Sequence, residues 1–297
     1  MKDRTKYIGG SDMGGILNIS DHSSPMLVWH RKVSGETKEM TDNMYFGTAL
    51  ESFIKKEFKK RNKHLKVTKA SFLKHDLFPY MGGIPDGYVE EEDGKKCILE
   101  IKTANEYMKG DWENDVPPHY YAQVQWYMGL ADLDKAYVAC LCGGNKYFQY
   151  EVPRCDAYIE NAVNKAVGFW NGYVLTKIRP WTTGKNCDKR LLGQRIESSE
   201  NDVVLRSNYI DDPANEYNEL KKKEKDLKKK ISLSYNRILE EMGNHKKVES
   251  HTFKMEYKNI ERTSVDTNAL KETYPDVFEK VKKQGNSGRL SIKEKTK

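Results

Sequence analysis

The hydrophobic pattern in the first part of the chain has a helical period. Between residues 44 and 62 an apolar side chain recurs at every fourth position, at Phe46, Leu50, Ile54 and Phe58. This spacing places the four side chains on one face of a helix. Further helices are predicted after the glycine-rich segment 8–15, over 25–33, over 120–129 and over 157–173.

Short extended segments separate these helices. Residues 84–89 and 97–102 form two of them, and residues 136–142 and 146–152 form two more across the turn at 143–145. Helices interleaved with strands are typical of an α/β domain. Residues 1–181 are therefore predicted to form one domain with a mixed central sheet.

The pattern changes after Trp181. Residues 182–213 are polar and irregular, and we interpret them as a linker. Residues 214–297 are predicted to form a charged helical extension with a small α/β end. Its elements are a helix over 215–242, a strand over 247–257, a helix over 268–283 and a strand over 288–293.

The charged helix carries a spaced apolar row. The row consists of Tyr217, Leu220, Leu227, Ile231, Tyr235 and Ile238. It approximates a heptad pattern that Glu224 interrupts, and a solvated helix with one packed face explains it equally well. The lysine-rich run 221–230 is a solvated face in one interpretation and a contact for the DNA backbone in the other.

Composition sets the class of protein. The 297 residues include 51 Lys and Arg against 44 Asp and Glu, a net charge of +7 that is compatible with a polyanionic partner. No apolar run approaches the roughly 20 residues that a membrane span needs. The polar start, Met1 to Tyr7, does not resemble a signal peptide. Five cysteines without a C-x-x-C pair indicate reduced thiols in a cytoplasmic protein.

Three residues carry the candidate chemistry. Asp86 follows a proline, and fourteen residues later comes Glu100-Ile101-Lys102 on a predicted strand. Residues two apart on a strand share a face, so Glu100 and Lys102 project together. Two carboxylates suit Mg²⁺, to which the backbone carbonyl of Ile101 could add an oxygen. An acid-x-Lys pair alone also fits an ion pair on a surface strand.

The predicted roles follow from phosphodiester hydrolysis. Asp86 and Glu100 hold Mg²⁺ against the scissile phosphate, and Lys102 orients or helps to deprotonate the attacking water. Glu51, on the preceding helix, binds the metal or positions its water. Gln123 hydrogen-bonds the nucleophile or holds Lys102.

Five segments in a fixed order strengthen this interpretation. They are Ile8-Gly-Gly-Ser-Asp12, Phe46-Gly-Thr-Ala-Leu-Glu51, Gly83-Ile-Pro-Asp-Gly87, Leu99-Glu-Ile-Lys-Thr103 and Tyr120-Tyr-Ala-Gln-Val-Gln-Trp-Tyr127. Together they resemble the YqaJ-type viral recombinase family, relatives of phage lambda exonuclease, over about residues 4–175. Ile84 departs from the small polar residue that the family often has before the proline.

The resemblance implies a fold, an activity and partners. The fold is the PD-(D/E)xK core, a restriction-endonuclease-like mixed sheet flanked by helices. The activity is Mg²⁺-dependent 5′→3′ degradation of one strand of linear duplex DNA, with Mn²⁺ as an expected substitute, leaving 3′ single strands for annealing recombination. The partners are duplex DNA ends, a single-strand annealing protein and copies of the chain in a trimeric ring. The setting is the cytoplasm of a bacterial host, with the gene on a phage or prophage.

The resemblance also implies site residues. Asp86, Glu100 and Lys102 match the metal and catalytic positions, with Glu51 and Gln123 as accessory residues. A second group binds the DNA 5′-phosphate and consists of Arg4, Ser11 and Tyr120.

Other functions stay open at this stage. The same fold also supports a structure-specific or nicking endonuclease, and an incidental acidic patch fits a DNA-binding or assembly protein without catalysis. Cys140 and Cys142 share a strand face, but no closely spaced cluster of four cysteines is present, so no iron–sulfur cluster is expected. His119 is interpreted as a loop residue, and Trp112 either stacks on a base or packs in the core.

Overall fold

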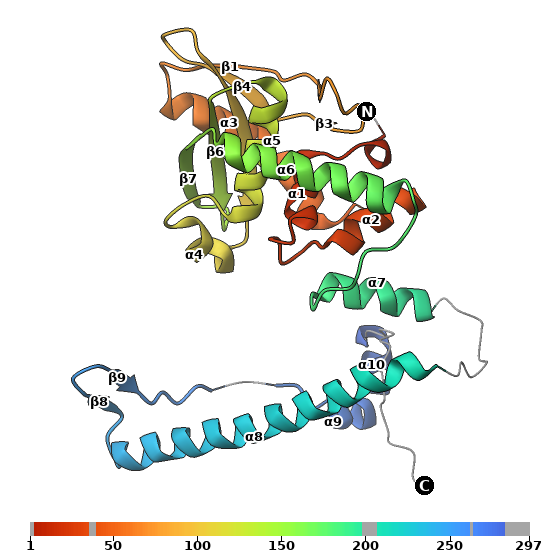
Figure 1. Ribbon diagram of the computed structural model, residues 1–297. Helices are drawn as coiled ribbons and strands as arrows, with labels where there is room; N and C mark the ends of the chain where they lie inside the picture. Colours follow the sequence, from red (N-terminus) through yellow and green to blue (C-terminus); the bar gives the residue numbers. More distant parts are fainter. Residues whose placement is uncertain (1–2, 36–39, 198–206, 262–263, 283–297) are drawn as a thin grey trace. The chain divides into compact units, whose positions relative to one another are not determined.

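The computed structural model of the chain describes residues 3–35, 40–197, 207–261 and 264–282 (Figure 1). Contacts divide the chain into two compact units, residues 1–198 and residues 199–297. Each unit is described by itself below.

A five-stranded mixed sheet forms the centre of the first unit. Its order is β1-β4-β5-β6-β7, with β5 and β6 parallel and every other neighbouring pair antiparallel. The strands are β1 (Lys66–Thr68), β4 (Gly87–Glu90), β5 (Lys96–Ala104), β6 (Lys135–Cys142) and β7 (Lys146–Pro153). The parallel pair requires a crossover, which α5 supplies between β5 and β6.

Helices cover both faces of this sheet (Figure 1). On one face, Ile54 and Phe58 pack against Leu99 and Ile101 in a smaller apolar core. On the other face, α5 and α6 pack over a larger core that includes Ile98. The helices are α1 (Gly10–Ile16), α2 (Pro25–Ser34), α3 (Asp42–Arg61), α4 (Lys109–Trp112), α5 (Pro118–Ala131), α6 (Asp156–Phe169) and α7 (Asn186–Glu197).

Shorter elements complete the first unit. The 3₁₀ turns are η1 (Arg4–Lys6) and η2 (Glu106–Met108), and a π-helical turn, η3 (Trp170–Val174), extends α6. A separate two-stranded sheet pairs β2 (Leu73–Lys74) with β3 (Gly82–Gly83). The predicted elements up to residue 173 are present, except that the glycine-rich segment 8–15 itself forms most of α1 instead of a turn before a helix. The elements β1, β2, β3 and α4 escaped prediction because they are only two to four residues long.

The predicted irregular linker is wrong between residues 186 and 197, where α7 forms. Asp188, which is 1% exposed, anchors this helix. Its carboxylate accepts a hydrogen bond from the hydroxyl of Ser24, which is the N-cap residue of α2. It also accepts hydrogen bonds from the backbone amide and the hydroxyl of Thr183. The bond between Ser24 and Asp188 joins residues 164 positions apart, so hydrophobic periodicity does not reveal it. The domain limits of 1–181, 182–213 and 214–297 stay a prediction.

We expect Asp188→Ala to lower the free energy of unfolding by about 1–3 kcal/mol, because the substitution leaves the buried hydroxyl of Ser24 and the partly buried donors of Thr183 without this acceptor. Urea unfolding at neutral pH measures the change. Asp156→Ala is the matched control, since Asp156 is an exposed residue that pairs with Arg154, and its loss should cost less than about 1 kcal/mol. Equal losses in the two variants would contradict the anchoring role of Asp188.

The second unit is built on one long helix. Its described elements are η4 (Asn208–Ile210), α8 (Asp211–Met242), β8 (Lys247–Glu249), β9 (Lys254–Glu256), α9 (Thr267–Thr273) and α10 (Pro275–Val281). The predicted strand over 247–257 is wrong, because the Ser250 hydroxyl accepts from the amides of Thr252 and Phe253 and turns the chain into a hairpin.

The helix predicted over 268–283 is interrupted. It divides at Tyr274, ahead of Pro275, into α9 and α10. Proline disfavours the helical conformation in the residue before it and cannot donate a backbone hydrogen bond, which explains the break. The strand predicted over 288–293 lies outside the described residues.

Candidate active site

The candidate site lies on β5, the central strand of the first unit. Ile98, Glu100 and Lys102 alternate with residues that pack under α3, so they face α5 instead. The pairing of Gly87 with Leu99 brings the segment before β4 to the same place, and the Ile101 amide donates to Asp86 Oδ2 at 2.7 Å. The structure thus joins Asp86, Glu100 and Lys102 across two neighbouring strands.

Gly87 allows the close strand approach that this arrangement needs. A Cβ atom at this position would lie 3.0 Å from the backbone oxygen of Thr68 on β1 and 3.5 Å from the Leu99 side chain. The sequence Pro85-Asp86-Gly87 therefore presents a carboxylate just before a strand that is packed tightly on both sides.

Glu100, Lys102 and Gln123 form a closed triangle of hydrogen bonds. Lys102 Nζ donates to Glu100 Oε1 at 2.6 Å and to Gln123 Oε1 at 3.2 Å, while Gln123 Nε2 donates to Glu100 Oε1 at 2.5 Å. Glu100 is 3% exposed and Gln123 6% exposed. Gln123, on α5, therefore holds the side chains of both Glu100 and Lys102 on β5, in the interior of the protein.

One oxygen of this cluster has no partner. Glu100 Oε2 is buried and makes no hydrogen bond with any described residue, although Oε1 accepts two. Burying a carboxylate oxygen without a partner costs free energy. A divalent cation that prefers oxygen ligands would satisfy it, with the carboxylate of Asp86 close by. The residues present thus fit a metal, although no group of three acidic, His or Cys ligands is assembled among the described residues.

The electrostatics of the site agree with this interpretation. Burial raises the pKa of Glu100 to about 8, and it also raises the pKa of Asp86. For Lys102, burial lowers the pKa, but the neighbouring carboxylates of Glu100 and Asp86 outweigh burial and raise the pKa above its ordinary value. The Asp86 charge adds to the rise in the pKa of Glu100, whereas Lys102 keeps its proton at neutral pH.

Glu51 reaches the site from the other side of the sheet. It lies on α3 and pairs with Lys55 at 3.1 Å, and Lys55 Nζ also donates to the backbone oxygen of Asp86 at 2.8 Å. The Glu51 charge contributes to raising the pKa of Asp86. The structure therefore places Glu51 beside Asp86 rather than beside Glu100, with Lys55 between them.

Comparisons with known proteins assign the chain to a family. The family described as the YqaJ-like viral recombinase domain matches residues 1–134. YqaJ of Bacillus subtilis (strain 168) is 30% identical over 298 residues, which cover 98% of this chain and 92% of the relative. The chain belongs to the YqaJ family. The sequence-based assignment to this family is confirmed.

Solved structures extend the likeness of this YqaJ family member to the fold. LHK-Exo in complex with dAMP has a TM-score of 0.50 and 18% sequence identity, over 66% of this chain and 96% of that chain. LHK-Exo is described as an alkaline exonuclease from Laribacter hongkongensis. The likeness to LHK-Exo in complex with dAMP confirms the predicted architecture, a mixed central sheet flanked by helices.

The residues that the YqaJ family resemblance assigned to a 5′-phosphate are divided between two places. The guanidinium of Arg4 donates to the Ser11 hydroxyl, and both side chains are exposed. Helix α1 adjoins the triangle, because a Cβ atom at Gly10 would lie 3.0 Å from Gln123 Cγ and 2.9 Å from Tyr127 Cζ. The role of Arg4 and Ser11 stays a prediction.

Tyr120 lies with the catalytic candidates. Lys102 Nζ is 4.8 Å from the centre of its ring, so the aromatic face supports the ammonium group. Trp112 is fully buried and packs against Tyr120, which excludes base stacking by its indole in this conformation. His119 belongs to the first turn of α5 rather than to a loop, and its ring packs on Tyr120.

Several supporting residues of this YqaJ family site were not predicted. Tyr127 accepts from Gln123 Nε2 at 3.4 Å, and Lys55 bridges Glu51 and Asp86. Each lies four residues after a predicted site residue on the same helix, a spacing that could have revealed it. Lys32 ties the N-terminal segment to α1 by pairing with Asp12 at 2.7 Å, and no local spacing indicates that contact.

The raised pKa of Glu100 predicts how stability changes with pH. The folded chain holds the Glu100 proton up to about pH 8, whereas the unfolded chain releases it near 4.5. Stability is therefore greatest below pH 4.5 for this group and falls by up to about 1.4 kcal/mol per pH unit towards pH 8. We expect the free energy of unfolding in EDTA to drop more steeply between pH 5 and pH 8 in the wild type than in Glu100→Gln. Parallel pH curves for the two proteins would contradict this.

Proposed function

We propose that this YqaJ family member is a metal-dependent deoxyribonuclease, a 5′→3′ exonuclease that acts on linear duplex DNA. The observation that carries the proposal is the buried, unpartnered Glu100 Oε2 beside Asp86, with Lys102 held 2.6 Å from the other oxygen of the same carboxylate. Phosphodiester hydrolysis needs carboxylates that can bind a metal and a positively charged side chain close to them. Asp86 and Glu100 supply the carboxylates here, and Lys102 supplies the positive charge.

Glu100 and Asp86 would hold Mg²⁺, for which Mn²⁺ would substitute, and Glu51 and the Ile101 carbonyl are further proposed ligands. When bound, the cation supplies charge neutralisation at the phosphate and makes water a better nucleophile. Lys102, whose raised pKa keeps it protonated, donates hydrogen bonds to the attacking water and offsets negative charge on the phosphoryl oxygens. It orients water rather than accepting its proton. Gln123 keeps Lys102 and Glu100 in position.

The polarity of degradation is proposed to come from the region around α1. Arg4 and Ser11 are exposed, hydrogen-bonded to each other and carried by segments that adjoin the Gln123 side of the site. A terminal phosphate bound there would place the first phosphodiester of that strand towards Glu100. Tyr120 would contribute next to Lys102.

The biological setting is proposed from family membership. The product would be a 3′ single strand for annealing recombination, passed to a single-strand annealing protein. A homo-oligomer, trimeric in the family resemblance, would encircle the duplex in the cytoplasm of a bacterial host. No helix among the described residues is both long enough and apolar enough to span a membrane.

The test is digestion of four DNA substrates with Mg²⁺ and with EDTA. They are linear duplexes with 5′-phosphate, 5′-hydroxyl or hairpin-blocked ends and a closed circular duplex, each labelled so that either strand can be followed. We expect Mg²⁺-dependent loss of the 5′-labelled strand, fastest with a 5′-phosphate, and intact circles. Arg4→Ala should remove the preference for the 5′-phosphate.

Other outcomes would identify other functions. Nicking of the closed circle would indicate a structure-specific or nicking endonuclease of the same fold. Binding of DNA without cleavage of any substrate, in Mg²⁺ or Mn²⁺, would indicate a non-catalytic DNA-binding or assembly protein.

A further inference from the structure

Helix α8 of the second unit exposes a row of large apolar side chains. The row consists of Tyr217, Leu220, Leu227, Ile231, Tyr235 and Ile238, whose exposed fractions lie between 44% and 60% in the described structure. Spacings of three, four or seven residues keep the row on one side of the helix over about 32 Å, at 1.5 Å per residue. We call these six residues the α8 seam.

The seam is flanked on both sides by positive charge. Lys221 and Lys228 follow one edge, and Lys223, Lys230 and Arg237 follow the other, at the positions that flank the seam of a paired helix. Glu216, one heptad before Lys223, is the acidic residue at a flanking position, and it lies at the N-terminal end of the seam; the flanking positions 221, 223, 228, 230 and 237 are all basic. A helix that packs on the seam would therefore meet five basic side chains along its own flanks.

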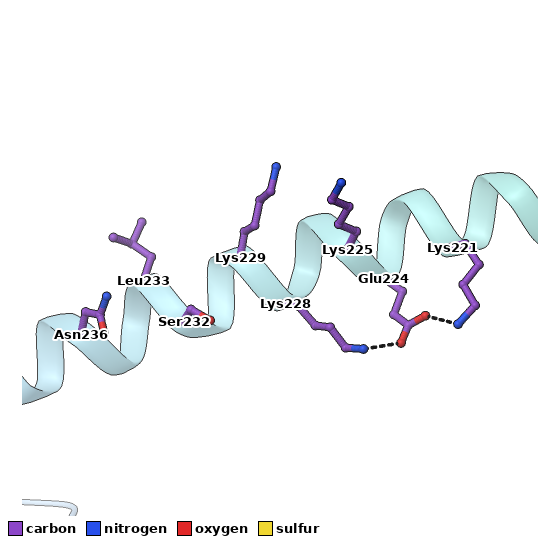
Figure 2. A pocket seen from close by; sticks show the side chains of 8 residues that line it. All are labelled: Lys221, Glu224, Lys225, Lys228, Lys229, Ser232, Leu233 and Asn236. Carbon is purple, nitrogen blue, oxygen red and sulfur yellow. Dashed lines mark hydrogen bonds and ion pairs between the residues drawn. The ribbon is translucent and has the colours of Figure 1, made fainter. Parts of the chain in front are cut away.

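A single acidic residue interrupts the seam. Glu224 takes the seam position between Leu220 and Leu227, and its carboxylate lies 2.7 Å from both Lys221 and Lys228 (Figure 2). A polar residue at one such position specifies the register of a helix pair at some cost in stability. The side chains of Lys225, Lys229 and Leu233 point away from the side of the helix that carries Glu224 (Figure 2).

These charges disfavour two partners that the protein itself could supply, a second copy of α8 and the C-terminal segment 283–297. A second copy of α8 would bring its basic flanks against the same basic flanks in either orientation, and in a parallel pair Glu224 would face Glu224. The C-terminal segment 283–297 carries five Lys and Arg residues and one Glu, so it too would meet like charge. Duplex DNA would neutralise the lysines but leaves a row of six exposed apolar side chains unexplained.

We propose that the α8 seam docks an amphipathic helix of a second protein whose apolar row is flanked by Asp and Glu residues. Apolar contact along the seam would supply affinity, and the opposite flanking charges would supply specificity. The residue of the partner that faces Glu224 would be basic or an amide, which sets the register. The docking does not require the first unit to cleave DNA.

Two synthetic peptides test the proposal on the full-length protein. Each has three heptads with the same leucine and isoleucine seam and an amide opposite Glu224, and they differ only in having Glu or Lys at every flanking position. We expect fluorescence anisotropy to show binding of the Glu peptide at least about tenfold tighter than binding of the Lys peptide. Equal affinities, or no binding of either peptide, would overturn the proposal.

Matched variants locate the binding surface. Leu227→Glu should weaken binding of the Glu peptide at least about tenfold, whereas Leu233→Glu, on the same helix but outside the seam, should leave it unchanged. Circular dichroism should show equal helix content in both variants. Reversal of the flank at Lys223, Lys230 and Arg237 to Glu should shift the preference towards the Lys peptide. An equal loss in Leu227→Glu and Leu233→Glu would contradict a defined seam.

Two further outcomes would assign the seam to a different occupant. If sedimentation shows that Leu227→Glu converts an oligomer of the wild type to monomers, the occupant is a second copy and the proposal fails. If Leu227→Glu weakens duplex DNA binding as much as it weakens peptide binding, the occupant is nucleic acid and the proposal fails. Unchanged sedimentation and unchanged DNA binding in Leu227→Glu would support the proposal.

Discussion

Lys102→Ala is expected to lower the rate of Mg²⁺-dependent DNA cleavage by about 10²–10³-fold or more, while DNA binding stays near the wild-type level. The ammonium group of Lys102 is aimed by three contacts, with Glu100 Oε1 at 2.6 Å, Gln123 Oε1 at 3.2 Å and the Tyr120 ring at 4.8 Å. A group held this firmly can donate to the attacking water without reorganisation, and alanine cannot replace it.

Removal of Lys102 also leaves Glu100 without its cation. The raised pKa of Glu100 allows the carboxyl group to take up a proton, so the variant should fold, and Lys102→Met keeps the side-chain volume as a second variant. Single-turnover kinetics measure the cleavage rate of each variant, and fluorescence anisotropy with a labelled duplex measures its affinity for DNA. Lys96→Ala is the matched control, because Lys96 lies at the exposed start of the same strand. Cleavage at the wild-type rate by both Lys102 variants would contradict the role of Lys102.

Asp86→Asn is expected to abolish the stabilisation that Mg²⁺ or Mn²⁺ gives to the folded protein. A cation present at 100 times its Kd stabilises the wild type by about 2.7 kcal/mol, because it binds the folded chain alone. In the variant, the amide can keep its oxygen towards the Ile101 amide but carries no charge for the metal. Cleavage should fall with metal affinity.

Thermal unfolding with and without Mn²⁺ measures this effect. Asp93→Asn serves as the control, since Asp93 is an exposed residue paired with Lys95 in the turn before β5. The wild type and the control should gain the same Tm shift with Mn²⁺, and Asp86→Asn should gain almost none. A full shift in Asp86→Asn would show that the cation binds elsewhere.

The proximity of Glu100 and Lys102 could be predicted from the sequence, for a physical reason. Strand residues two apart share a face whatever the rest of the fold does, so the placement of Glu100 with Lys102 follows from local geometry. The position of Gln123 followed from family resemblance together with a helical pattern. Whether these groups bind a metal or cleave DNA stays a prediction, with the unpartnered Glu100 Oε2 in its favour.

Contacts between distant segments could not be predicted in the same way. The spacing on α3 indicates the pairing of Lys55 with Glu51, but the contact of Lys55 with the backbone of Asp86 forms because α3 packs beside the segment before β4. Asp188 binds Ser24 across 164 residues, so α7 looked like part of a polar linker. Such contacts depend on the packing of whole elements, which neither periodicity nor charge pattern in one window encodes.

In the second unit, prediction from the sequence was limited in a different way. The pattern predicted α8 and its apolar row, but it left open whether the row is packed or solvated. In the described structure the row is exposed, and the basic flanks then indicate what kind of partner would fit. Turn residues also changed the outcome, because Ser250 and Pro275 break segments that periodicity had treated as continuous.

Crystals soaked in Mn²⁺ would test the shared metal position of Asp86 and Glu100 most directly. We expect an anomalous difference peak about 2.1 Å from Glu100 Oε2 and from a carboxylate oxygen of Asp86, within reach of water held by Lys102. A peak that contacts neither acid, or no peak at Mn²⁺ concentrations that support DNA cleavage, would contradict the account.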